Sequence, residues 1–221
     1  MATQPDSSSQ PRVPLSRDRV LNAAIRLADD GGIESLTMRK LGRALGVEAM
    51  SLYNHVANKD DILDGIVDLV MNETELPPTT EDWDVAVRRC AISAHEALLR
   101  HPWACSLVMS PTTGFTPRMR YMEVLLGRLS EAGFSPELTY HAYHALDSHI
   151  LGFTLWQIGH TVATEGGEDL ATTILRDLSV DEYPYLAEHV EQHFAGSDDE
   201  GEFEFVLDLI LDGLKRIRGA A

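Results

Sequence analysis

Apolar residues recur at intervals of three and four along most of the chain, and this spacing predicts helices. No run alternates between apolar and polar residues as a half-buried strand would, and no internal repeat is present. We therefore expect an all-α fold. Glycine, proline and capping residues divide the pattern into helices at about 16–31, 38–45, 48–55, 58–74, 82–100, 102–109, 117–132, 136–163, 182–194 and 202–218.

Short polar side chains precede several of these helices. Such side chains accept a hydrogen bond from a backbone N–H of the first helical turn. The expected N-caps are Ser16, Thr37, Asn58 and Ser135.

The chain divides into three expected parts. Residues 1–15 are rich in Ser, Gln and Pro and have little to bury, which predicts a disordered N-terminal arm. We expect residues 16–62 to form a small N-terminal domain of three helices, and residues 63–221 to form a larger helical domain. The boundary between these two domains lies inside the helix at 58–74.

Two helices of the larger domain carry more apolar surface than one core needs. The helix at 136–163 is apolar on most sides, and the last helix has a seam made of Phe203, Val206, Ile210, Gly213 and Ile217. Gly152 and Gly213 each cost roughly 1 kcal/mol relative to alanine, so we expect a close helix crossing at these positions. We interpret the two helices as a homodimer interface; a large monomeric core is the alternative.

The charge balance limits the possible partners. The 18 Lys+Arg against 35 Asp+Glu give a net charge of −17, which excludes coating of nucleic acid by bulk electrostatics. Residues 77–221 account for 10 − 23 = −13 of this charge. The segment at 37–59 is the exception, because Arg39, Lys40, Arg43 and Lys59 oppose Glu48 alone, or 4 − 1 = +3. Any contact with nucleic acid must therefore be local.

Cys90 and Cys105 are too few for a disulfide framework, and we do not expect them to form a redox switch. No apolar leader precedes the first helix, and no apolar run approaches the ~18 residues of a membrane span. We expect a cytoplasmic protein without a membrane partner.

Residues 37–55 have the order of a helix-turn-helix: a capped helix, a turn at Gly46 and a second helix. The two helices are expected to be held together by Leu41, Leu45, Val47 and Leu52. In a helix-turn-helix the second helix lies in the major groove of DNA. An ordinary corner between two helices is the alternative interpretation.

The outward face of the second helix can read base edges. Asn54 can pair with an adenine, Ser51 with a base or a phosphate, and Ala49 or Met50 can touch a thymine methyl. Tyr53 and His55 are expected at phosphates, and Arg39 can reach a guanine or a phosphate. Lys59 adds a charge at a helix N-terminus, which already favours an anion. The candidate DNA-binding residues are Thr37, Arg39, Ala49, Met50, Ser51, Tyr53, Asn54, His55 and Lys59.

The segment from Leu36 to Lys59 resembles the DNA-binding segment of the TetR family of transcriptional regulators. Thr-x-Arg at 37–39, Leu-Gly-Val at 45–47, Ser-Leu-Tyr-x-His at 51–55 and Asn-Lys at 58–59 stand in register. Weaker similarity covers most of the remaining chain. The resemblance implies an all-helical homodimer with a small DNA-binding domain and a larger domain that dimerises and encloses an inducer.

The resemblance also shows departures. Tetracycline-binding members of that family hold the drug and its magnesium with a His, an Asn, a Phe and a second His. An ungapped register places Glu75, Cys90, Ala94 and Val108 at those positions, and Trp156 where the partner subunit would supply a magnesium-associated Glu. We therefore expect an inducer other than tetracycline and no cofactor.

Methionine and aromatic side chains of the larger domain can line an adaptable apolar pocket, because methionine fills irregular space. Ordinary core packing explains them equally well. The candidate ligand-binding residues are Met71, Trp103, Met109, Phe115, Met119, Met122 and Trp156.

His141, His144 and Asp147 follow one helical face and could bind a transition metal. We expect polar contacts at the subunit interface instead, and no metal site. Asp147, Ser148 and His149 have the residue types of a catalytic triad, but neighbours on a helix point about 100° apart and cannot align as base and nucleophile. We therefore expect no catalytic residue and no enzymatic activity.

Together these patterns predict a ligand-responsive transcriptional regulator that binds double-stranded DNA as a homodimer. We expect a repressor, which a small apolar inducer releases from a palindromic operator; an activator would use the same contacts. The inducer would move the helix at 58–74 and change the ~34 to 36 Å separation of the two recognition helices. The alternative is a helical small-molecule-binding protein or enzyme with a degenerate helix-turn-helix.

Overall fold

The computed structural model describes residues 14–76, 81–110, 116–164, 181–195 and 201–220. These residues form helices and connecting turns without a strand, so the expected all-α fold is confirmed. Contacts divide the chain into two compact units, Met1–Ile66 and Val67–Ala221. The division falls inside the helix α4 (Lys59–Met71), a few residues beyond the boundary expected at 62. Most of the expected N-terminal arm lies outside the described residues.

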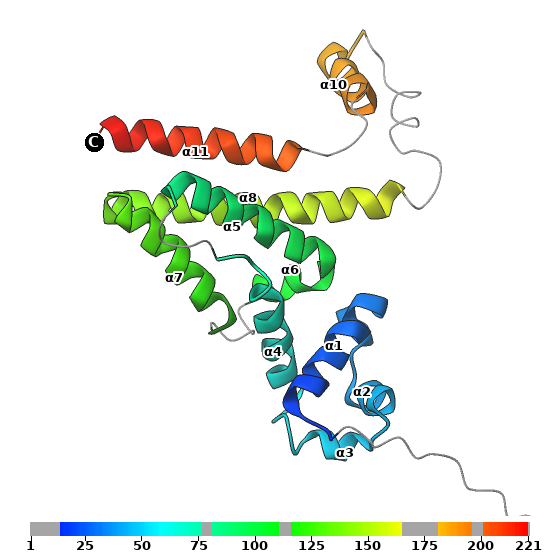
Figure 1. The fold of residues 1–221 in the computed structure, drawn as a ribbon. Helices are drawn as coiled ribbons and strands as arrows, with labels where there is room; N and C mark the ends of the chain where they lie inside the picture. Colours follow the sequence, from blue (N-terminus) through cyan, green and yellow to red (C-terminus); the bar gives the residue numbers. More distant parts are fainter. Residues whose placement is uncertain (1–13, 77–80, 111–115, 165–180, 196–200, 221) are drawn as a thin grey trace, which may run out of the picture. The chain divides into compact units, whose positions relative to one another are not determined.

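The first unit contains α1 (Arg17–Gly31), the short 3₁₀ helix η1 (Ile33–Ser35), α2 (Met38–Leu45), α3 (Ala49–Leu52) and the first part of α4 (Figure 1). The apolar spacing did not predict η1. The buried core of this unit includes Val20, Ala24, Leu36, Leu41, Leu52, Ile62 and Ile66. Their burial holds α2 and α3 against α1 and α4.

Capping and one ion pair fix the helix ends of the first unit. Ser16 accepts a hydrogen bond from the Arg19 backbone N–H at 3.3 Å, which confirms the expected cap. The expected caps Thr37 and Asn58 likewise accept from the third residue after each, at 3.2 and 2.8 Å. Arg17 pairs with Asp61 at 2.7 Å, and this hydrogen bond is the main cause that lowers the pKa of the Asp61 carboxyl.

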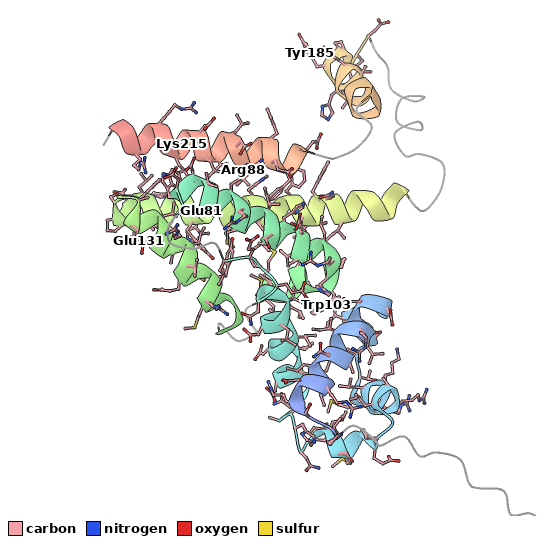
Figure 2. The ribbon with its side chains drawn as sticks, viewed as in Figure 1. Glu81, Arg88, Trp103, Glu131, Tyr185 and Lys215 are labelled. Carbon is pink, nitrogen blue, oxygen red and sulfur yellow. The ribbon has the colours of Figure 1, made fainter. Side chains whose placement is uncertain are left out.

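The second unit contains α5 (Trp83–Arg100), α6 (Pro102–Val108), α7 (Thr116–Glu131), α8 (Pro136–Thr164), α10 (Pro184–Ala195) and α11 (Glu202–Ala220). α5 packs against α6, α7 and α8, and α11 packs against α5 and α8 (Figure 1). Arg88 and Lys215 mark the junction of α5 and α11 (Figure 2), where ion pairs of 2.8 Å each join Arg88 to Asp208 and Lys215 to Asp84. In the described ranges, no helix combines the length and hydropathy that crossing a bilayer requires.

Both cysteines are buried in the second unit. Burial raises the pKa of the Cys90 thiol to about 12 and that of the Cys105 thiol to about 11. Reactive cysteines have lowered pKa values and solvent access. The two thiols have neither property, which agrees with the expectation of no redox switch.

The outer faces of α8 and α11 expose large apolar side chains. They are Tyr140, Leu155 and Trp156 on α8, and Phe205, Leu209 and Ile217 on α11. Of the seam expected on the last helix, Phe203 is instead buried in the core, and Ile217 is exposed. Among the described residues, a Cβ atom added at Gly152 or Gly213 would meet nothing within 4 Å, so the expected close helix crossing does not occur in this part of the chain.

Phe203 at the start of α11 is stacked between two histidines. Its ring centroid lies 4.0 Å from that of His95 on α5 and 4.6 Å from that of His149 on α8. His95 Nδ1 is 2.7 Å from the Thr154 hydroxyl, and His149 Nε2 donates to the Phe203 carbonyl at 2.9 Å. The stack therefore connects α5, α8 and α11.

We expect the free energy of unfolding to fall as the pH drops below about 6.5, the ordinary pKa of histidine. Burial is the main cause that lowers the pKa of both His95 and His149, although Glu204 partly opposes it at His95. The unfolded chain then binds more protons than the folded chain, so stability present above that pH is lost below it. Urea denaturation at about pH 7.5 and about pH 5.5 measures the loss.

The matched comparison is a variant with His95→Gln and His149→Gln against one with His189→Gln, because His189 is exposed on α10. The double variant should lose less stability than the wild type between the two pH values, and the His189 variant should match the wild type. Equal losses in all three proteins would contradict the assignment.

Candidate nucleic-acid interface and ligand cavity

Gly46 forms the corner between α2 and α3. Its backbone lies in the left-handed region, with φ 68° and ψ 32°, where a Cβ atom is unfavourable. The Gly46 N–H donates to the Arg43 carbonyl at 3.2 Å, and the Val47 N–H donates to the Gly42 carbonyl at 2.9 Å. These bonds end α2 and direct the chain into α3, as the sequence predicts.

Gly42 lets α2 approach the start of α3. A Cβ atom there would lie 2.9 Å from the Val47 carbonyl oxygen and 3.1 Å from the Ala49 nitrogen. Both atoms belong to the backbone, so they cannot rotate away as a side chain would. Sequence reasoning missed this residue, because a glycine inside a helical pattern does not show which neighbour lies beside it.

The nine candidate DNA-binding residues are all exposed or half-buried. The Met50 side chain is 75% exposed and that of Tyr53 is 46% exposed, whereas Leu52 between them is fully buried. This arrangement anchors α3 by one side and presents the other to a partner. Contact with DNA stays a prediction.

The second helix expected at 48–55, called the recognition segment from here on, is less helical than expected. The α-helix ends at Leu52 rather than near 55, and Tyr53 to His55 continue in turns. The His55 and Val56 N–H groups both donate to the Leu52 carbonyl, at 2.8 and 3.1 Å. Asn and His are weak helix formers, which explains why the regular helix does not extend through Asn54 and His55.

The positive patch lies on this same unit. Arg39, Lys40, Arg43 and Lys59 are all exposed, and none of them forms an ion pair with a carboxylate in the described part of the chain. Exposed cations of this kind can neutralise phosphates. The expected +3 segment therefore remains available for a polyanion.

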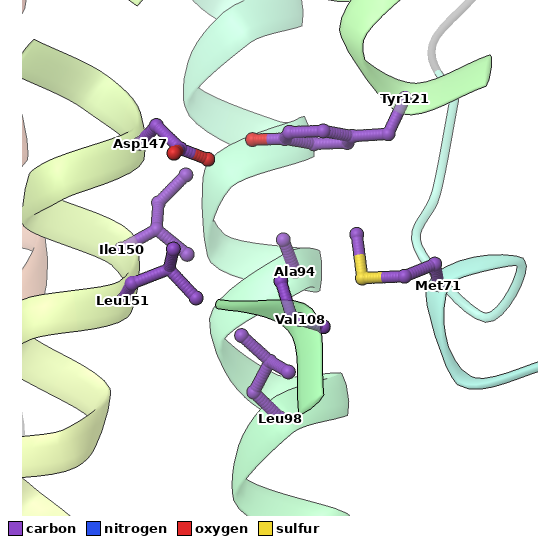
Figure 3. Close-up of a pocket in the computed structure, with 8 residues that line it drawn as sticks. All are labelled: Met71, Ala94, Leu98, Val108, Tyr121, Asp147, Ile150 and Leu151. Carbon is purple, nitrogen blue, oxygen red and sulfur yellow. The ribbon is translucent and has the colours of Figure 1, made fainter. Parts of the chain in front are cut away.

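A small cavity lies inside the second unit (Figure 3). Its volume is about 10 Å³, enough for about one water molecule. The lining residues are Met71, Ala94, Leu98, Val108, Tyr121, Asp147, Ile150 and Leu151. Figure 3 shows the Tyr121 hydroxyl and the Asp147 carboxylate pointing toward each other at one end of this cavity.

The structure does not bring the candidate ligand-binding residues together around one cavity. Met71 lines the small cavity, whereas Met119 and Met122 lie on a more open groove of about 520 Å³ along α7, with Arg120, Glu123 and Leu126. The others have different environments: Trp103 is buried, Met109 and Trp156 are exposed, and Phe115 lies outside the described residues.

The face with His141 and His144 is exposed on α8. The His144 ring packs edge-on against Tyr140 and Tyr143, with centroids 4.4 and 5.3 Å apart. Within the described ranges, no group of three His, Cys, Asp or Glu residues is placed to hold a metal ion. Asp147 points into the cavity instead, which sequence reasoning missed because it considered only the residues of one helix.

Comparison with protein families gives two matches that together span most of the chain. Residues 20–66 match "Bacterial regulatory proteins, tetR family", and residues 76–218 match "Tetracyclin repressor-like, C-terminal domain". The first match covers the helix-turn-helix, and the second covers the unit with the cavity.

Curated relatives and solved structures agree with these matches. The chain is 31% identical to the transcriptional repressor DrrR1 of Streptomyces coeruleorubidus, over 94% of this chain and 80% of that protein. It is also 31% identical to the class C tetracycline repressor of Escherichia coli, over 92% of both chains. The structure of ActR from Streptomyces coelicolor in complex with actinorhodin has a TM-score of 0.74 and 27% identity, and covers 94% of this chain and all of that one.

Proposed function

This chain belongs to the TetR family of DNA-binding transcriptional regulators, and from that premise we propose that its homodimer represses transcription at a palindromic operator until a small, largely apolar inducer releases it. The helix-turn-helix carries the proposal. Leu52 is fully buried, while Met50, Tyr53 and Asn54 beside it are exposed. Exposed side chains of these types can contact base edges in a major groove. The relatives are regulators rather than enzymes, and such a protein would work in the cytoplasm, where its operator lies.

Two copies of the recognition segment would occupy successive major grooves, ~34 to 36 Å apart, on a palindrome. The exposed apolar faces of α8 and α11 support pairing of two chains. The acidic residues that follow the DNA-binding unit limit non-specific binding, because they repel phosphates.

Ligand response is supported by ActR, whose structure was solved with actinorhodin. In this chain, Ala94 and Val108 line the cavity, and the ungapped register places both where tetracycline-binding members of the family have drug-binding side chains. We propose that the inducer enters this cavity and differs from tetracycline. α4 carries Met71, which lines the cavity, on the same helix as Lys59. Movement of α4 would thus change the separation of the recognition segments.

A mobility-shift assay on the DNA flanking the gene tests the proposal. A regulator should bind a palindrome there at nanomolar concentration, roughly 10³-fold or more tighter than unrelated DNA. Equal binding to both DNAs would instead support the alternative of a helical small-molecule-binding protein with a degenerate helix-turn-helix.

Substitutions at Lys59 and Asn54 should have different effects on operator binding. Lys59→Ala should weaken binding to all sequences alike and reduce the salt slope by about one, because it removes a phosphate contact. Asn54→Ala should relax the preference at one base position, at a cost of roughly 1 to 3 kcal/mol. Binding to an operator library at several salt concentrations measures both. Identical behaviour of the two variants would contradict the separation of phosphate from base contacts.

A further inference from the structure

Two polar groups lie at one end of the otherwise apolar cavity of the second unit. Six of the lining side chains are hydrocarbon or thioether, and the other two are Tyr121 of α7 and Asp147 of α8. Tyr121 is only 4% exposed and Asp147 is half-buried. A pocket that is mostly apolar with a few convergent polar groups is the usual design of a small-molecule site, in which the polar groups select the ligand.

The chemistry of these groups restricts the ligand. A carboxylate only accepts hydrogen bonds, and a phenol hydroxyl donates one and accepts others. A hydrocarbon ligand would form no hydrogen bond with either group, so neither group would favour its binding. A ligand carboxylate would be repelled by Asp147. A ligand that donates hydrogen bonds is favoured instead, because the two oxygens of a carboxylate can accept several hydrogen bonds at once.

We infer that the inducer is an apolar molecule with a hydrogen-bond-donating group, preferentially an ammonium, which binds the Asp147 carboxylate with help from the Tyr121 hydroxyl. A charge-assisted hydrogen bond is about twice as strong as a neutral one, which favours the ammonium over a hydroxyl. The charge of −13 on residues 77–221 also attracts a cation. The inference rests on the proposed function, because it takes this cavity as the inducer site.

The cavity must enlarge to admit such a ligand, since it now has room for about one water molecule. Met71 forms part of its wall, and an unbranched methionine side chain can rearrange more easily than a branched one. Displacement of Met71 would act directly on α4. The polar end thus selects the ligand, while the apolar wall responds to its size.

Four compounds of similar size test the inference: benzylamine, benzyl alcohol, toluene and benzoate. Their affinities for the full chain are measured by isothermal titration calorimetry at neutral pH. Benzylamine should bind at least about tenfold more tightly than toluene and benzoate, with benzyl alcohol between them. Asp147→Asn should remove most of the benzylamine preference and leave toluene unchanged, and Tyr121→Phe should cause a smaller loss.

Glu123→Gln is the matched control, because it removes one negative charge from the open groove on α7 and not from the cavity. It should leave all four affinities unchanged. The inference is overturned if benzoate binds as well as benzylamine, if none of the four compounds binds, or if Glu123→Gln rather than Asp147→Asn weakens benzylamine. The order in which the wild type binds the four compounds tests the inference even if a variant does not fold.

Addition of the same compounds to the operator complex separates this inference from the proposed function. Benzylamine that binds through Asp147 but leaves the complex intact supports the ligand class and contradicts the proposed release. Benzylamine that releases the wild type and Asp147→Asn from the operator equally well contradicts the ligand class and supports the proposed release.

Discussion

Gly152→Arg is expected to convert the dimer to a monomer and to weaken operator binding roughly 10²- to 10⁴-fold, the range over which linkage of two binding modules raises affinity. Gly152 is exposed on α8, and a Cβ atom there would meet nothing within 4 Å. The arginine therefore has space beside the residues of the single chain that the structure describes. It would instead block the close approach of a second chain to the apolar face of α8.

The fold of the single chain should tolerate this change, because arginine is a better helix former than glycine by up to about 1 kcal/mol. Gly127→Arg on α7 is the matched control, since a Cβ atom there also meets nothing within 4 Å. Sedimentation velocity and a mobility-shift assay measure assembly and binding. A Gly152→Arg protein that remains dimeric, or a Gly127→Arg protein that dissociates, would show that the interface lies elsewhere.

Gly42→Ala is expected to weaken operator binding by at least about 100-fold, because it pushes the recognition segment away from α2. The added Cβ would lie 2.9 Å from the Val47 oxygen and 3.2 Å from the Ala49 Cα. Overpacking of this kind costs about 1 to 3 kcal/mol of stability. Displacement of the segment also affects several base contacts together, each worth roughly 1 to 3 kcal/mol.

Gly31→Ala is a useful comparison for this experiment. A Cβ at Gly31 would meet the Ser35 side chain, at 3.0 and 3.1 Å, rather than backbone, so a side chain must give way instead of α3. Denaturation midpoints and operator affinity are measured for both variants. If Gly42→Ala binds the operator as tightly as Gly31→Ala, then α3 does not depend on its close contact with α2.

Local signals predicted the helices and the corner well. Ser16 and Thr37 form the caps expected of them, and Gly46 has the left-handed conformation that a glycine turn implies. These features depend on a residue and its close neighbours in sequence, so the pattern of one segment contains the necessary information. The short form of α3 was harder to predict, because the end of a helix depends on small differences in propensity.

The ligand-binding candidates show that residue type alone does not predict which side chains line a cavity. Methionines and aromatic residues were selected by type, but residue type does not say which face of a helix points inward. Met71 faces the cavity, whereas Met119 and Met122 face an open groove. Ala94 and Leu98 also line the cavity and have nothing in sequence to distinguish them from other core residues.

The sequence by itself determined the helical architecture, the helix-turn-helix, and the separation of a small positive segment from an acidic remainder, because each depends on spacing or charge within a continuous stretch. Tertiary structure alone decided which glycine is packed against backbone and which lies open, as at Gly42 and Gly152. It also decided that Tyr121 and Asp147, from different helices, share one cavity. Contacts between distant segments arise from the packing of whole helices, and no local pattern of residues records them.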